Sequence, residues 1–189
     1  MAVIKITDAS RGLNADLTPE ELQVGAWSSV SNMRFSNGYA QRFKGTATVF
    51  DAPVEAPYFI APFQTDTKRY WISAGLTKVF ADDGVSSRVE ITPASVFTGG
   101  VDDRWSGGSL GGLIALTNGV DQPRYWDGNT ANDLALLPGW NANWRCKVIK
   151  PFKNYLVALD ITKTATRYSS MVKWSHSAVP GSMPASWDE

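Results

Sequence analysis

The chain has 189 residues, of which 43% are hydrophobic and 19% are charged, so it is long enough to bury a core. Its 18 basic and 18 acidic side chains cancel, which excludes the strongly basic balance of a dedicated nucleic-acid-binding protein. Aromatic residues make up 12% of the chain and include 8 tryptophans, a composition that favours all-β packing.

The start of the sequence bears on where the protein resides. Residues 1–5 lack the apolar core of a signal peptide, and no run approaches the roughly 18 apolar residues of a membrane span. We therefore expect no membrane segment. The protein should be made and kept in a cytoplasm, or released from one.

Residues 1–56 are predicted to form an N-terminal arm with one hairpin. Thr18 and Glu21 fit the two positions of a capping box, which predicts a short helical turn within an irregular lead-in. Residues 32–43 alternate apolar and polar side chains around Asn37-Gly38, a dipeptide typical of two-residue hairpin turns. Residues 48–50 then suggest an edge strand, followed by a linker that contains two prolines.

Residues 57–189 contain a repeated hairpin pattern. When Ile72, Ile114 and Val157 are aligned, successive units are offset by 42 and 43 residues. A period of about 40–45 residues with several short strands per unit is typical of β-propeller blades. Armadillo or HEAT repeats have a similar period, but glycine, proline and β-branched residues occupy the positions where their helices would run. A sandwich of ordinary hairpins remains the alternative fold.

Individual strands of these units can be placed approximately. The first unit should have strands near 58–63, 69–74, 77–82 and 88–92, followed by a glycine-rich loop over 94–111. The second covers 112–137, with the Trp126 region packed between sheets, and the third begins near Trp144. Residues 177–189 resemble an unfinished connection. Because a propeller usually needs at least four blades to close, we expect either a fragment of a longer chain or completion by neighbouring chains.

The sequence offers no convincing catalytic, metal or cofactor site. His176 is the only histidine and Cys146 the only cysteine, which is too few for a typical zinc site, and no nucleophile elbow surrounds His176. The paired carboxylates at 82–83 and 102–103 point in opposite directions if their backbone is extended, so neither pair alone has glycosidase geometry. No Gly-Lys-Ser/Thr follows the glycines at 107–112. We expect a protein that is not an enzyme and that carries no cofactor or metal.

Two segments are candidates for contact with partners or DNA. The hairpin over 27–45 places basic residues beside aromatic ones, a pattern that can bind single-stranded nucleic acid but that also describes the two faces of any hairpin. The 94–111 loop is the second candidate, because loops on a rigid scaffold usually carry binding. The residues proposed for these contacts are Arg34, Arg42, Lys44, Asp102, Asp103, Arg104 and Trp105.

Several segments resemble the tail nozzle proteins of short-tailed bacteriophages, also called tail tubular protein B. The opening over residues 25–45 is similar to the start of such proteins, and so is the ending over 171–188. Further similar segments are YWISAG (70–75), GGVDDRW (99–105), NGVDQPRYWDG (118–128) and FKNYLVALD (152–160). Nozzle proteins are longer than this chain, so the resemblance implies an N-terminal portion of one.

The resemblance implies a non-enzymatic virion protein that contains a β-propeller. Copies of nozzle proteins, usually six, form a ring below the portal and adaptor, and the genome leaves through its channel. The implied partners are therefore other copies in a homo-hexamer, the adaptor, further tail proteins and, transiently and without sequence preference, the viral DNA. The implied location is the virion tail, assembled in the host cytoplasm. The alternative is a carbohydrate-binding or glycoside-cleaving propeller in which Trp105, Trp126 or Trp140 stacks on sugars.

Overall fold

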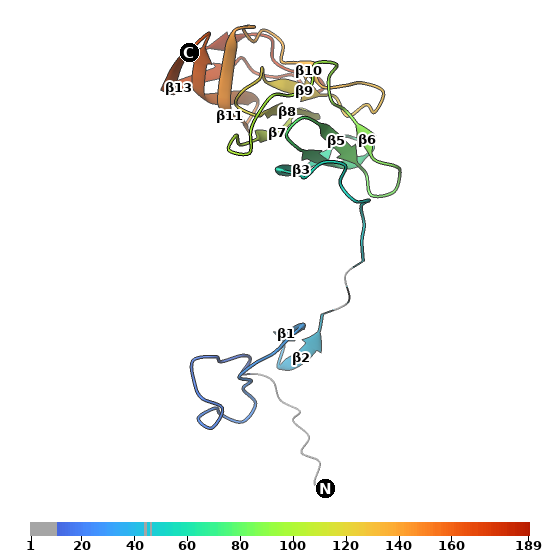
Figure 1. The fold of residues 1–189 in the computed structure, drawn as a ribbon, viewed down its shortest axis with the longest axis vertical. Coiled ribbons are helices and arrows are strands. Elements are labelled where there is room, and N and C mark those ends of the chain that lie inside the picture. Colours follow the sequence, from blue (N-terminus) through green and yellow to red (C-terminus); the bar gives the residue numbers. More distant parts are fainter. Residues whose placement is uncertain (1–10, 44, 46) are drawn as a thin grey trace. The chain divides into compact units, whose positions relative to one another are not determined.

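The structure, a computed structural model, describes residues 11–43, 45 and 47–189 (Figure 1). Throughout these residues the regular elements are β-strands and none is a helix, so the all-β prediction is confirmed. None of the described segments could therefore cross a membrane as a long apolar helix. The chain divides into two compact units between Thr48 and Val49.

The smaller unit is built around the predicted hairpin. Strands β1 (Met33–Ser36) and β2 (Tyr39–Arg42) pair antiparallel, and Asn37 and Gly38 join them with φ angles of 52° and 77°. Positive φ at both positions is the geometry that favours Asn-Gly in a two-residue turn. The predicted helical turn is present as a single turn, in which the Glu21 N–H donates to the Thr18 carbonyl at 3.0 Å, but it does not extend into a helix. The Glu21 carboxylate accepts hydrogen bonds from the Thr18 hydroxyl at 3.0 Å and from the Thr18 N–H at 3.3 Å.

The larger unit consists of three four-stranded antiparallel sheets, and in each the strands pair in chain order. The first sheet contains β3 (Phe59–Gln64), β4 (Arg69–Ala74), β5 (Val79–Asp82) and β6 (Val89–Glu90). The second contains β7 (Ser106–Leu110), β8 (Leu113–Thr117), β9 (Arg124–Trp126) and β10 (Ala135–Leu136). The third contains β11 (Trp144–Phe152), β12 (Tyr155–Lys163), β13 (Thr166–Ser175) and β14 (Trp187–Asp188).

The second sheet lies between the other two and has a hydrophobic core on each face. Along β8, Ile114 and Leu116 belong to the core shared with the first sheet, whereas Leu113 and Ala115 belong to the core shared with the third. This alternation follows from the two-residue period of a strand. All four side chains are at most 5% exposed, so both interfaces are packed.

Strand β7 occupies residues 106–110, which were predicted to belong to a glycine-rich loop, and that part of the prediction is wrong. Gly107 and Gly108 let β7 approach its neighbours: a Cβ on Gly107 would lie 2.5 Å from the Ala115 carbonyl oxygen, and one on Gly108 would lie 2.5 Å from Pro151 Cδ. In consequence the first strand of the second sheet lies beside both β3 and β11, the first strands of the other two sheets.

The C-terminal segment contributes the fourth strand of the third sheet. Residues 177–189 were expected to be an unfinished connection, but Ser175 and Trp174 of β13 pair with Trp187 and Asp188 of β14. The Trp187 indole Nε1 also donates to the Pro138 carbonyl at 3.0 Å. The chain end is thereby fixed to the sheet as a short edge strand.

Candidate interaction surfaces

Residues 102–105 form the cluster predicted for partner contact, and one of its carboxylates, that of Asp103, holds the cluster's own loop in place. Asp103 Oδ2 accepts the Gly100 backbone N–H at 2.9 Å, and Oδ1 lies 3.4 Å from Lys147 Nζ. The backbone hydrogen bond from Gly100, together with Lys147, lowers the pKa of Asp103. Asp102 and Arg104 are exposed, so these two are the residues of the cluster that the loop presents outward.

Trp105 has a structural role that its sequence context does not reveal. Its indole Nε1 donates to the Gly75 carbonyl at 2.9 Å, and its ring lies edge-on to Phe97 with centroids 4.8 Å apart. The side chain is partly buried against the core between the first and second sheets. It therefore anchors the 98–105 loop to the first sheet.

The tryptophans of the carbohydrate hypothesis are not free to stack on sugars. Trp126 is 1% exposed and Trp140 is 9% exposed, and Trp105 is held as described above. Trp140 packs edge-on to Trp187 at 4.9 Å, and its Nε1 donates to the Trp144 carbonyl at 3.0 Å. Trp126 and Trp140 therefore do not offer a ring face to a sugar, because each ring already fills space between protein segments.

The basic residues of the hairpin do not converge on one face. Arg42 pairs with Met33 across the hairpin, whereas Arg34 is the next residue along β1 and faces the other side. Arg34 Nη2 donates to Gln41 Oε1 at 3.3 Å. Lys44 lies outside the described residues. The hairpin and the 98–105 loop belong to different units.

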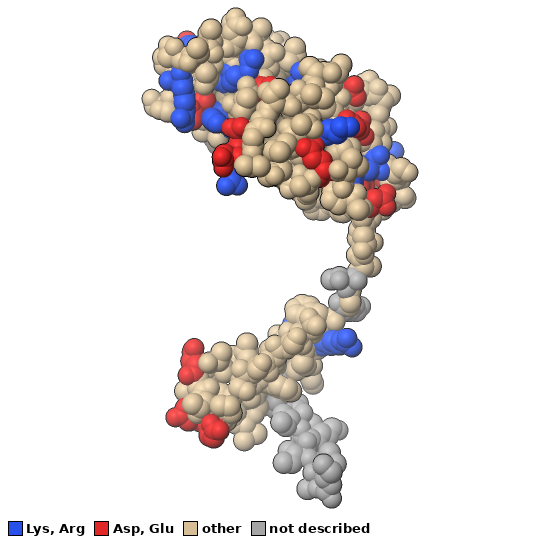
Figure 2. Space-filling view, viewed as in Figure 1, with Lys and Arg blue, Asp and Glu red and all other residues tan. Residues whose placement is uncertain are grey.

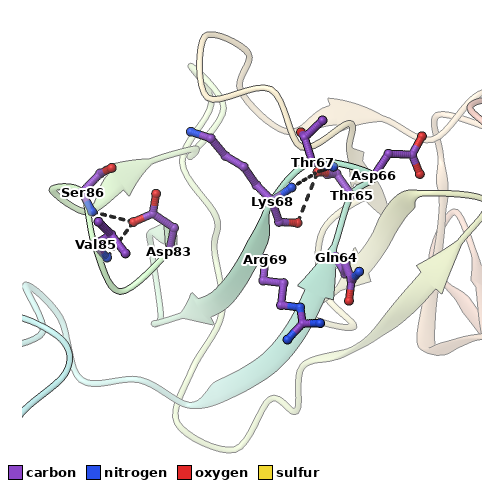
Figure 3. Close-up of a pocket in the computed structure, with 9 residues that line it drawn as sticks. All are labelled: Gln64, Thr65, Asp66, Thr67, Lys68, Arg69, Asp83, Val85 and Ser86. Atoms are coloured by element: carbon purple, nitrogen blue, oxygen red, sulfur yellow. Dashed lines mark hydrogen bonds between the residues drawn. The ribbon is translucent and has the colours of Figure 1, made fainter.

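One end of the first sheet carries a polar hollow between two turns (Figure 3). On one side the Thr65 hydroxyl accepts the Lys68 backbone N–H at 3.0 Å, and on the other Asp83 Oδ1 accepts Val85 and Ser86 N–H groups at 2.9 and 2.6 Å. These backbone hydrogen bonds, that of Ser86 first, lower the pKa of Asp83. In Figure 3 the Lys68 side chain extends toward the Asp83 turn, as expected if the two attract.

The hollow's polar groups hold its own turns and do not form a reacting pair. A second hollow adjoins it at the Thr65–Thr67 turn and is completed by the Gly111-Gly112 turn and Pro180-Gly181. Within the described residues, no three His, Cys, Asp or Glu side chains gather as a metal site would require. This end of the larger unit is thus a hydrated, turn-rich surface.

The sequence neighbours Ser175 and His176 do not form a catalytic site with Asp188. His176 Nε2 lies 3.1 Å from Asp188 Oδ2, but both side chains are more than half exposed. Ser175 is fully buried: its hydroxyl accepts the Leu156 N–H at 2.9 Å and donates to the His176 carbonyl at 2.7 Å. The serine hydroxyl therefore binds backbone and does not contact the imidazole.

Residues 49–57, which we call the strap, lie along part of the outer face of the first sheet, where Ile60 stays 59% and Trp71 46% exposed. Phe50 packs edge-on to Trp71 with ring centroids 6.3 Å apart. Arg88 donates to the carbonyls of Asp51 and Ala52 at 2.7 and 2.9 Å, and Glu55 accepts the Leu76, Thr77 and Lys78 N–H groups at 2.7–3.0 Å. The strap is thus held to the first sheet by these contacts.

Among the residues that the structure describes, no segment is bound along the outer face of the third sheet as the strap is along the first. Cross-strand pairing places its side chains together, and several of the apolar ones are well exposed: Phe152 at 62%, Trp174 at 42% and Val172 at 41%. We call this the open face and define it by Val148, Lys150, Phe152, Tyr155, Val157, Leu159, Val172 and Trp174. It was not foreseen from the sequence.

Charge does not single out one region on the view of Figure 2, where basic and acidic side chains of the larger unit are interspersed. The exposed apolar sheet face is accordingly the more distinctive surface. No protein-family model matches the chain, and no curated protein matches it.

Proposed function

We propose that the chain is a structural protein of a phage tail nozzle and forms part of a ring-shaped conduit for DNA ejection. The observation that carries the proposal is the stack of three similar four-stranded meanders with neighbouring first strands. Neighbouring four-stranded meanders with adjacent first strands support a propeller-like arrangement of blades. The sequence resemblance to nozzle proteins adds the biological setting.

The proposed mechanism is assembly. Rigid sheets present loops and an apolar face to neighbouring subunits, and the subunits together enclose the channel. The residues we propose for these contacts are the exposed Asp102 and Arg104 in the 98–105 loop and the arginines of the β1–β2 hairpin. The adaptor, other tail proteins and the passing DNA are the proposed partners, and the virion tail is the proposed location.

Light scattering combined with negative-stain electron microscopy of the purified chain tests this function. We expect a ring-sized oligomer with a central opening. Reversing the loop charges with Asp102→Lys and Arg104→Glu should weaken the ring, whereas Asp66→Lys, in an exposed turn of the first sheet, serves as a matched control. A stable monomer that binds glycans on an array would contradict the proposal and favour the carbohydrate-binding alternative.

A further inference from the structure

One row of residues crosses all four strands of the third sheet. Val157 of β12 pairs with Lys150 of β11 on one side and with Trp174 of β13 on the other, and Trp174 pairs with Asp188 of β14. Directly paired residues point to the same side of a sheet. The row therefore has a cation at one edge, an anion at the other and two apolar side chains between them.

The neighbouring rows of the open face are apolar. Val148, Leu159 and Val172 form the row on one side, with Leu159 39% exposed, and Phe152 pairs with Tyr155 on the other. The corresponding faces between the first, second and third sheets are filled by side chains of the adjoining sheet. Soluble monomers rarely leave a contiguous apolar patch of this kind uncovered, so it fits a partner that presents another apolar sheet face.

We propose that the open face binds the open face of a second copy of this chain, with the two-fold axis parallel to the strands. This symmetry reverses the strand order of the second copy, so that β11 of one copy lies over β14 of the other. Lys150 then faces Asp188 of the second copy, and Val157 faces its Trp174. Because the contact is isologous, the Lys150–Asp188 ion pair forms twice in the complex.

The same row disfavours the other two-fold arrangement. An axis perpendicular to the strands and lying between the sheets would place β11 over β11, so that Lys150 would face Lys150. Bringing like charges together costs free energy, so this row of residues favours the two-fold axis parallel to the strands over the perpendicular one. The Lys150 ammonium donates to the Gly107 carbonyl at 2.8 Å and the Asp188 carboxylate lies 3.1 Å from His176 Nε2. Each has capacity for a further hydrogen bond.

The expected pair is weak. One sheet face is small beside the roughly 800 Å² that each partner contributes to a standard stable interface. We therefore expect a dissociation constant on the order of micromolar, and a mass that rises with protein concentration. The inference goes beyond the nozzle proposal and does not rest on it, because it follows from this sheet alone.

Sedimentation equilibrium of the full chain over a range of concentrations tests the pair by charge exchange. Lys150→Asp and Asp188→Lys should each weaken association about tenfold, and the double variant K150D/D188K should restore it to within about threefold of the wild type. Val172→Glu should weaken association about a hundredfold, because it places a charge at the centre of the contact. Val85→Glu, at a site 93% exposed on the first sheet, should leave it unchanged.

The contrary outcomes are equally specific. Association that is insensitive to Val172→Glu would overturn the proposal, as would a chain that remains monomeric at every concentration. Two weakened single variants without recovery in the double variant would overturn the orientation given by the two-fold axis. Circular dichroism of each variant confirms that the sheets are intact. A failure of the pair is distinguishable from a failure of the nozzle proposal, which is judged by ring formation and glycan binding.

Discussion

The indole ring of Trp126 lies edge-on to the ring of Tyr70, with centroids 5.2 Å apart, and so joins the second sheet to the first. Phe63 completes the cluster at 5.6 Å from Trp126. The indole Nε1 donates to the carbonyls of Asn129 and Asn132 at 3.1 and 2.9 Å, which fixes the loop after β9. One side chain therefore holds both an interface and a turn.

Trp126→Ala should cost about 3–5 kcal/mol of unfolding free energy, because it leaves a cavity in a site that is 1% exposed. Trp126→Phe should cost less, since it keeps a ring but loses the two hydrogen bonds of Nε1. Urea unfolding followed by circular dichroism measures both. Val85→Ala is the control and should change stability by less than about 0.5 kcal/mol. Equal stability of Trp126→Ala and wild type would show that the cluster does not hold the sheets together.

Gly108→Ala should destabilise the chain by about 1–3 kcal/mol, because the added Cβ would lie 2.5 Å from Pro151 Cδ. Gly99→Ala is a matched control: its Cβ would lie 3.5 Å from the nearest atom, in ordinary contact. Thermal unfolding of the two variants side by side makes the comparison. A Gly108→Ala protein as stable as Gly99→Ala would mean that β7 and β11 are not closely packed.

The ion pair between Asp160 and Arg167 predicts a pH effect. Arg167 Nε donates to Asp160 Oδ1 at 2.7 Å, and this hydrogen bond with the neighbouring charge lowers the pKa of Asp160. Since the folded pKa lies below the unfolded value of about 4, the pair stabilises the fold fully above that pH. Its contribution is lost as the pH falls through the folded pKa.

Asp160→Asn should therefore reduce the loss of stability between about pH 5 and pH 2, measured by urea unfolding at a series of pH values. Asparagine is the appropriate replacement, because residue 160 has a φ of 56° and asparagine tolerates the left-handed region. The exposed Asp102→Asn variant controls for removing one carboxylate. An Asp160→Asn curve parallel to that of the wild type would show that the pair makes no difference.

Cys146 should be inert to thiol reagents in the folded protein. Its side chain is fully buried between the second and third sheets, and burial raises the pKa of the thiol to about 12. Because the thiolate is the reactive species, labelling with Ellman's reagent at pH 8 should occur only when the chain unfolds. Rapid stoichiometric labelling without denaturant would contradict the packing of these two sheets.

Much of the fold could be predicted from local pattern, and the misses have identifiable physical causes. The dipeptide Asn37-Gly38 predicts its hairpin because few other residue pairs accept a positive φ at both positions. Strand β7 was missed because the close approach that requires glycine at 108 is to Pro151, more than 40 residues away. Strand β14 is only two residues long and forms because it pairs with β13. This pairing leaves no signal in the local sequence of residues 187–188.

The three residues aligned as repeat equivalents, Ile72, Ile114 and Val157, do not lie on equivalent faces of their sheets. Ile72 and Ile114 were aligned as equivalent, but each points toward the other's sheet, while Val157 lies on the open face. A shift of one residue exchanges the faces of a strand, and spacing alone does not fix that register. For the same reason the open face could not be assigned from sequence. The structural role of Trp105 could not be predicted either, because its indole donates to a backbone carbonyl near another sheet, 30 residues away in sequence.

The central claim, that this chain is a structural part of a virion tail, is tested most directly by immunogold electron microscopy. Antibodies raised against the purified chain would be applied to purified phage particles from a lysate in which the chain is detected. The account predicts gold at the tail below the capsid portal, in intact particles and in isolated tails. Particles without label, together with detection of the chain only in the particle-free lysate, would contradict it.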